Sequence, residues 1–249
     1  MRITTLLALL LGLFLAGSAA AQFAPPATPA VEPENTLLLD LSSGGRVAIQ
    51  LRPDVAPNHV ARIKELARKG FYNGLTFHRV IEGFMAQGGD PAGDGTGGSQ
   101  LPDLKAEFNG LPHVRGAIAA ARQGAPDKAD AATVAAAENS ANSQFYIMLG
   151  TRLSLDRHYT VFGRVISGMN FVDGIAKGEP PENPPRILQA SIAADNKAPP
   201  APGQSFAASP APPPAATSHG GIAAGPKVPP PPSIRLPESK PTAPPTKSR

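Results

Sequence analysis

Cysteine is absent from the 249 residues of this chain. Its absence excludes disulfides, thiolate zinc sites, a cysteine nucleophile and a lipid-modified cysteine anchor. It does not report the redox compartment, although it is compatible with an oxidising one, where a stray thiol would be a hazard. Tryptophan is also absent, and there are only three tyrosines. Any chemistry that the chain performs must therefore rest on other residue types.

An excess of basic charge is missing from the part of the chain that carries apolar patterning. The formal net charge is +4, and the residues from Asp195 onward account for all of it, with six Lys or Arg against two Asp or Glu. The remaining residues are neutral overall, so nucleic acid binding is not indicated. No pair of histidines has the spacing of metal ligands, and we expect neither a metal nor a cofactor.

Long apolar runs are limited to the N-terminus, where the pattern predicts a signal peptide over residues 1–21. Arg2 provides the positive start, Leu6 to Ala16 form an apolar core too short to span a bilayer, and Ser18 to Ala21 are small residues before a cleavage site. Retention of this segment as a membrane anchor is the alternative. The sequence predicts export to the periplasm or beyond the cell, with no stable membrane insertion after cleavage.

Proline divides the rest of the chain into regions. Residues 22–34 form a Pro/Ala-rich linker, and 16 of the 30 prolines lie in residues 195–249. Such a composition buries too little apolar surface to offset the entropy lost on ordering. We therefore expect a disordered tail over 195–249 with polyproline II stretches, and one folded domain over 35–194.

The patterning of that domain predicts an α+β fold that is mainly β. One helix is expected from Asp54 to Gly70, where Val60, Ile63 and Leu66 share a face, and a second from Met169 to Ala176. Glycine-bounded apolar segments predict short strands, which are Leu37–Leu41, Val47–Leu51, Thr76–Ile81, Gly83–Gln87, Gly116–Ala121, Gln144–Leu149, Thr160–Val165 and Ile187–Ile192. This order predicts a closed antiparallel barrel capped by the two helices.

Three segments within this region carry a specific pattern. They are Gly70-Phe71-Tyr72-Asn73-Gly74-Leu75-Thr76-Phe77-His78-Arg79-Val80-Ile81, continuing to Gly98, then Asn142-Ser143-Gln144-Phe145-Tyr146-Ile147, and Leu155-Asp156-Arg157-His158-Tyr159-Thr160-Val161-Phe162-Gly163. Across residues 35–192 the chain resembles the cyclophilin-type peptidyl-prolyl cis–trans isomerases, and in particular their bacterial, exported members. The resemblance implies an eight-stranded barrel with the active groove on its outer face.

The resemblance also implies roles for individual residues. Arg79 would be catalytic, with Gln87 beside it. Substrate binding would fall to a proline pocket of Phe84, Met85, Tyr146, Leu155 and Tyr159, with Gln144, Ala121 and Arg122 holding the peptide chain. The implied partners are proline-containing peptides and unfolded exported proteins. We expect the protein to be a monomer.

The chemistry of Arg79 agrees with that role. Rotation about a prolyl bond is opposed by a barrier of about 18–20 kcal/mol, because the nitrogen shares its lone pair with the carbonyl. A fixed donor aimed at the nitrogen favours the twisted state, and arginine is always charged and carries several fixed donors. Outside its motif Arg79 would be an ordinary surface arginine. Its neighbour His78 is expected to be structural, and the Gly88-Gly89 and Gly97-Gly98 pairs lack the Lys-Ser/Thr of a phosphate loop, so we expect tight turns there.

Some features stay open or depart from the family pattern. Adjacent strand residues face opposite ways, so a shared pocket for Phe84 and Met85 rests on the resemblance alone. Tyr146 stands where the family commonly has Phe, Ser154 stands where Trp or Phe often occurs, and the loop over 123–142 is longer than usual and is expected to border the groove. Two other functions are conceivable: a binding module that uses the same groove, or a tail that serves as ligand for a partner domain.

Overall fold

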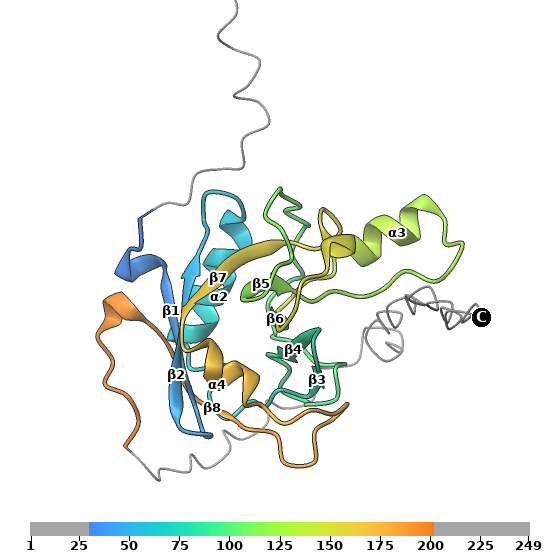
Figure 1. Ribbon diagram of the computed structural model, residues 1–249. Coiled ribbons are helices and arrows are strands. Elements are labelled where there is room, and N and C mark those ends of the chain that lie inside the picture. Colours follow the sequence, from blue (N-terminus) through green and yellow to red (C-terminus); the bar gives the residue numbers. More distant parts are fainter. Residues whose placement is uncertain (1–29, 202–249) are drawn as a thin grey trace, which may run out of the picture.

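A single antiparallel sheet forms the frame of the computed structural model, which describes residues 30–201. The predictions for residues 1–29 and 202–249 lie outside that range. The eight strands are β1 (Thr36–Leu41), β2 (Gly45–Leu51), β3 (Arg79–Ile81), β4 (Met85–Gly88), β5 (Ala117–Ala120), β6 (Phe145–Met148), β7 (Val161–Ser167) and β8 (Ile187–Ile192). They pair in the order β3-β4-β6-β5-β7-β2-β1-β8 (Figure 1). The predicted eight-stranded antiparallel sheet is therefore confirmed.

The sheet curls into an open half-barrel, and the prediction of a closed barrel is wrong. Its end strands, β3 and β8, form no ladder with each other. The free edge of β3 is instead taken by a loop, since Val80 donates its N–H to the carbonyl of Gly178 at 2.8 Å and accepts from the Gly178 N–H at 2.9 Å. Further along, Thr76 and Arg186 form an isolated bridge. Strand β3 has only three residues, and the loop at Gly178 occupies its outer edge. β8 therefore has no free edge of β3 to pair with, and the barrel stays open.

The two predicted helices are present with shorter bounds, as α2 (Pro57–Arg68) and α4 (Met169–Asp173). Pro57 begins α2 because a helix does not need the N–H of its first residue. Val60, Ile63 and Leu66 of α2 and Val172 of α4 all belong to the main core cluster, together with residues of the sheet. Short 3-10 helices complete the described elements, at Pro33–Asn35 (η1), Leu153–Leu155 (η2) and Ala193–Asp195 (η3).

Strand alternation gives the sheet two apolar faces. On β6, Phe145 and Ile147 enter the main core, whereas Tyr146 and Met148 enter a second cluster. The neighbouring strands follow the same alternation, because successive side chains of a strand point to opposite faces. The second cluster also contains Phe84, Met85, Ala117, Ala119, Ala121, Leu155 and Val161. One stretch of sheet thus has the core behind it and a separate apolar surface in front.

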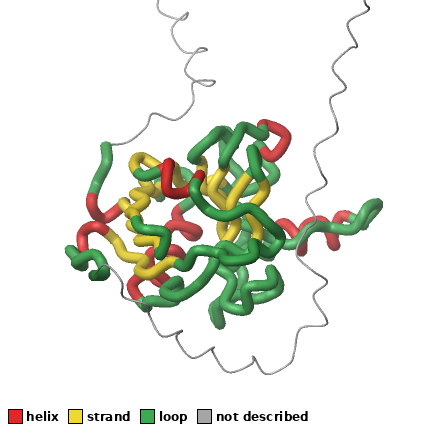
Figure 2. The backbone as a smooth tube through the Cα atoms, turned by 60° about the horizontal axis from the view of Figure 1, so that its bottom comes forward, coloured by secondary structure: helices red, strands yellow, loops and turns green. Residues whose placement is uncertain are grey.

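A third helix, α3 (Ala131–Glu138), was not predicted. Figures 1 and 2 show it projecting from the side of the sheet within the long loop. The Asp130 carboxylate caps its N-terminus by accepting from the N–H of Thr133 at 2.7 Å, and Ala137 is its one buried residue. Five of its eight residues are alanine, so no apolar stripe marks it as a helix.

Candidate active site

The sheet register aligns the functional candidates in one row. Arg79 of β3 pairs with Gln87 of β4, Gln87 pairs with Tyr146 of β6, and Tyr146 pairs with Ala119 of β5. Paired residues on adjacent strands point to the same face. A cation, an amide and an aromatic ring therefore lie side by side on the face that carries the second apolar cluster.

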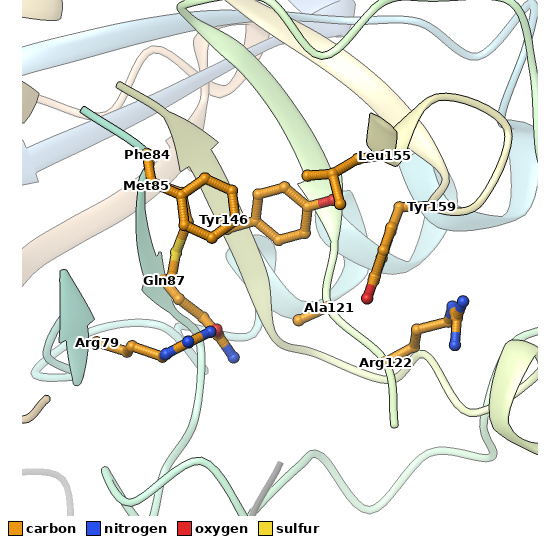
Figure 3. Close-up of a pocket in the computed structure, with 9 residues that line it drawn as sticks. All are labelled: Arg79, Phe84, Met85, Gln87, Ala121, Arg122, Tyr146, Leu155 and Tyr159. Carbon is orange, nitrogen blue, oxygen red and sulfur yellow. The ribbon is translucent and has the colours of Figure 1, made fainter. Parts of the chain in front are cut away.

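A pocket opens on this face, and Figure 3 shows the side chains that surround it. Nine of the ten residues predicted from the sequence line it, namely Arg79, Phe84, Met85, Gln87, Ala121, Arg122, Tyr146, Leu155 and Tyr159. The aromatic and aliphatic members are buried or half-buried. Arg79 and Gln87 lie together at one end, and Tyr159 and Arg122 lie at the other.

Phe84 and Met85 share the pocket because only one of them belongs to a strand. β4 begins at Met85, and Phe84 sits in the turn before it, with its N–H donating to the carbonyl of Ile81 at 3.0 Å. Gly83 takes the left-handed conformation that the turn requires, at φ 63°. The carbonyl of Phe84 accepts from the N–H of Leu149 at 2.8 Å, which fixes the turn against β6. Strand alternation therefore does not apply to this pair.

Gln144 is the predicted site residue that does not line the pocket. Its side-chain oxygen accepts from Gln87 Nε2 at 2.9 Å, and its own Nε2 donates to the carbonyls of Gly95 and Gly97 at 3.0 and 2.8 Å. The amide of Gln144 thus links the glycine-rich loop to Gln87. A direct hold on the substrate by Gln144 stays a prediction.

The Arg79 side chain is directed by a carboxylate that sequence reasoning missed. Arg79 Nε donates to Glu179 Oε2 at 2.7 Å, and the side chain of Arg79 is only 16% exposed. Because Nε is engaged by Glu179, the terminal nitrogens of the guanidinium are left to face Gln87 and the pocket (Figure 3). The backbone pairing of Val80 with Gly178 places Glu179 beside Arg79. No local sequence pattern connects residues this far apart in the chain.

Arginine side chains lie over two of the aromatic rings of the pocket. The Arg122 guanidinium lies 4.6 Å from the centre of the Tyr159 ring and donates from Nε and Nη2 to the carbonyl of His158, at 3.1 Å each. Arg152 lies 5.5 Å from the centre of the Phe84 ring. Ser154, which stands where the family often has an aromatic residue, is exposed.

Sequence reasoning also missed a buried histidine behind the pocket wall. His113 Nε2 lies 3.1 Å from the hydroxyl of Tyr146, and its Nδ1 lies 2.8 Å from Asp156 Oδ1. Burial lowers the pKa of His113 although Asp156 acts to raise it. Burial also raises the pKa of Tyr146 well above its ordinary value, so that its hydroxyl stays protonated. A single histidine in a loop gives no sequence signal for such a contact.

Histidine and acidic side chains elsewhere do not gather into a metal site. Among residues 30–201, no three His, Asp or Glu side chains are arranged to hold a metal ion. His78 is buried, and burial lowers its pKa. Across the same range no helix is long and apolar enough to cross a membrane.

Comparison with known proteins agrees with this geometry. A family model described as cyclophilin type peptidyl-prolyl cis-trans isomerase/CLD matches residues 36–192. A probable peptidyl-prolyl cis-trans isomerase of Brucella suis is 49% identical over 184 residues, which cover 68% of this chain and 87% of the relative. Peptidyl-prolyl cis-trans isomerase B of Bacillus subtilis is 39% identical over 141 residues, covering 56% and 89%.

Solved structures give the same result. A cyclophilin from Hirschia baltica superposes with a TM-score of 0.58 at 29% identity, covering 67% of this chain and 77% of that one. A cyclophilin type isomerase of Cryptosporidium parvum, solved in the presence of the dipeptide Ala-Pro, gives 0.53 at 25% identity, covering 63% and 98%. The family model alone spans more than half of the sequence, and the pocket lies within that span. The chain therefore belongs to the cyclophilin-type peptidyl-prolyl cis–trans isomerases, and it is an enzyme of that class.

Proposed function

We propose that the pocket between Arg79 and Tyr159 is the site where this isomerase rotates X-Pro bonds. The observation that carries the proposal is the row formed by Arg79, Gln87 and Tyr146, which places one directed cation at the edge of an apolar pocket. Proline is apolar and fits such walls, while its nitrogen would face the guanidinium. The Ala-Pro dipeptide used with the Cryptosporidium relative supports a proline ligand.

Catalysis then follows from preferential stabilisation of the twisted amide. Twisting localises the lone pair on nitrogen, and a donor at that nitrogen gains strength as the bond leaves planarity. The apolar walls lower the local dielectric and strengthen the interaction. A rate gain of ~10⁵-fold requires only about 7 kcal/mol of such preference. Gln87 donates a hydrogen bond to Gln144, which holds the Gln87 side chain in place beside Arg79.

Substitution of Arg79 tests this assignment. We expect Arg79→Ala to remove most of the exchange rate measured by NMR on a short Ala-Pro peptide, with circular dichroism unchanged. Arg79→Lys should recover little, because an ammonium is a hydrated point charge without the planar fork. The loss should fall mainly on kcat, since the pocket walls supply ground-state binding. A folded Arg79→Ala protein with near-normal exchange would favour the alternative, a binding module that uses the same groove.

We further propose that the enzyme acts as a monomer on unfolded exported proteins, as a member of the bacterial exported branch, and assists their folding. Uncatalysed prolyl isomerisation takes tens to hundreds of seconds, slow enough to limit folding. The charged start, short apolar core and small-residue exit of residues 1–21 support export. The proposed catalytic unit spans residues 35–194, because all nine pocket residues lie inside it. Residues 22–34 and 195–249 would be linker and tail.

Export is tested by the mass of the protein recovered outside the cytoplasm. Cleavage after Ala21 predicts a mature chain that begins at Gln22, because the residues before that bond are small. Intact mass spectrometry of the periplasmic fraction measures the start directly. A recovered protein that still begins at Met1 would instead support a retained membrane anchor.

A further inference from the structure

His113 is a fully buried residue that contacts the wall of the pocket from behind. It is 0% exposed, and it does not line the pocket itself. Its ring lies 6.1 Å from the ring of Tyr146, nearly parallel at 21°, and 6.4 Å from the ring of Tyr159. The two tyrosine rings lie 5.9 Å apart and meet edge to face. His113 is thus the buried third member of an aromatic cluster whose other two members line the pocket.

The hydrogen bonds of His113 have one consistent direction. Asp156 Oδ1 lies 2.8 Å from His113 Nδ1 and accepts from the backbone N–H of His113 at 2.8 Å. Because a carboxylate only accepts, Nδ1 carries the proton, and Nε2 presents its lone pair. The Tyr146 hydroxyl, 3.1 Å from Nε2, must then donate to it. The order of donation is Tyr146 to His113 to Asp156.

The Tyr146 hydroxyl depends on this acceptor. Tyr146 is only 6% exposed, so water is not available to replace His113 as its partner. A buried hydroxyl without a partner is strongly unfavourable, and it would turn toward any acceptor that a bound peptide offers. While His113 accepts from it, the wall that faces the proline stays apolar and the ring stays in place.

We propose that His113, oriented by Asp156, is a positioning residue for the proline pocket: it holds the Tyr146 hydroxyl away from the proline ring and so sets how tightly X-Pro peptides bind. The inference rests on the function proposed for the pocket. His113 acts through Tyr146 and touches no substrate. Its effect should therefore appear in peptide affinity, while Arg79, two strands away from Tyr146 in the sheet, governs the rate of bond rotation.

Two substitutions each remove one of the two side-chain hydrogen bonds of His113 and keep the other. The amide of asparagine reaches only as far as Nδ1, so His113→Asn keeps the donor to Asp156 and loses the acceptor for Tyr146. The amide oxygen of glutamine reaches the position of Nε2, so His113→Gln keeps that acceptor. We expect His113→Asn to weaken binding of an Ala-Pro peptide by about tenfold, and His113→Gln to stay within about twofold of the parent protein. NMR titration gives the Kd, and exchange at saturation gives the rate, which should change little.

A double-mutant cycle identifies the Tyr146 hydroxyl as the group that transmits the effect. In a Tyr146→Phe background the His113→Asn substitution should no longer weaken binding, since no hydroxyl is left without a partner. Asp156→Ala provides a second route if the asparagine variant does not fold: without that acceptor the His113 proton can move to Nε2, which then no longer accepts from Tyr146. The Asp156 side chain is 30% exposed, and its removal leaves no buried charge. Its effect on the Kd should likewise vanish when Tyr146 is replaced by Phe.

His59 supplies the matched control. It is another buried histidine whose Nδ1 lies 2.6 Å from a carboxylate, that of Glu107, and it does not line the pocket. His59→Asn should lower the Tm and leave the Kd unchanged.

Equal weakening of peptide binding by His113→Asn and His113→Gln, or an effect that persists in the Tyr146→Phe background, would overturn the inference. Loss of exchange in Arg79→Ala with an unchanged Kd in His113→Asn would reject this inference alone, whereas normal exchange in Arg79→Ala would reject the proposed site.

Discussion

The position of the Arg79 guanidinium depends on Glu179, which reaches it from the loop beside β3. Glu179 Oε2 accepts from Arg79 Nε at 2.7 Å, and the Glu179 side chain is 53% exposed. A pair whose carboxylate is this exposed adds little to stability, because water and salt screen it. The hydrogen bond instead orients Arg79: once Nε donates to Glu179, the guanidinium plane is fixed and its terminal donors face the pocket. We regard Glu179 as a positioning residue for Arg79.

Removal of that acceptor should slow catalysis without weakening binding. We expect Glu179→Ala to lower the exchange rate at peptide saturation by about threefold, the size of effect that exposed pairs produce, and to leave the Kd unchanged. Glu179→Gln keeps an oxygen that accepts from Nε, so it should stay closer to the parent rate. NMR exchange on the Ala-Pro peptide measures both. A faster Glu179→Ala protein would mean that Glu179 competes with the substrate for Arg79.

Some residues of the site were readable from the sequence and others were not. Arg79, Gln87 and Tyr146 lie inside continuous motifs, and strand pairing then brings the motifs together. Glu179 and His113 reach the site through loops and have no motif of their own. Their contacts depend on where distant loops come to rest on the sheet, which no local periodicity encodes.

At the scale of elements, helix α2 takes its N-terminal cap from a distant segment. Its N-cap position is Ala56, which offers no side-chain acceptor. The Glu107 carboxylate accepts instead from the backbone N–H groups of Asn58 and His59, both at 3.0 Å. The start of a helix has unpaired N–H groups and a partial positive charge, so a carboxylate is well placed there. Glu107 therefore ties α2 to the loop before β5.

The substitution Glu107→Gln should loosen this connection. We expect a loss of about 1–2 kcal/mol in the free energy of unfolding, as for other lost helix caps, together with a lower Tm and an unchanged peptide Kd. Glu65→Gln is the control, because Glu65 pairs with Lys69 on the exposed face of the same helix and should have no measurable effect. Equal Tm values for the two variants would show that Glu107 does not cap α2.

The elements that sequence reasoning identified are those with a regular apolar pattern. The stripe of Val60, Ile63 and Leu66 marked α2, and glycine-bounded apolar runs marked the strands. The alanine-rich α3 has no stripe, because only Ala137 faces the protein. Closure of the sheet was predicted wrongly because it depends on the edge of β3 at Val80, which a loop occupies. Edge contacts of this kind are set by tertiary packing and lie beyond local pattern.

At the scale of the whole molecule, we expect the three buried histidines of residues 30–201 to make the fold sensitive to acid. His59, His78 and His113 are 3%, 6% and 0% exposed, and they lie in separate parts of the structure. Burial is the main cause that lowers the pKa of each below the ordinary value of 6.5. Glu107 and Asp156 oppose this for His59 and His113, as do Asp90 and Asp94 for His78, but the net shift stays downward.

The sign of the pH dependence follows from the proton balance. Below pH 6.5 the unfolded chain takes up protons on these histidines, while the folded protein, with lower pKa values, still resists them. Unfolding therefore binds protons in this window, and stability falls as the pH drops through it. Glu107 affects stability at lower pH. Burial raises its pKa, but hydrogen bonds from Asn58 and His59 outweigh burial and lower the pKa from 4.5. The stability that Glu107 contributes is therefore lost only as the pH falls below that value.

We therefore expect the urea midpoint to be steady from pH about 8 to about 7, and to decline between about 6.5 and 5 before carboxylates titrate. His78→Phe should reduce that decline. Both ring nitrogens of His78 are buried without a hydrogen-bond partner in the described part of the chain, so an apolar ring leaves no group unpaired and removes one titrating site. Urea unfolding followed by circular dichroism at a series of pH values measures the midpoint in both proteins. A midpoint that is flat down to pH about 5, or a decline of the same size in His78→Phe, would show that the buried histidines do not set the acid limit of the fold.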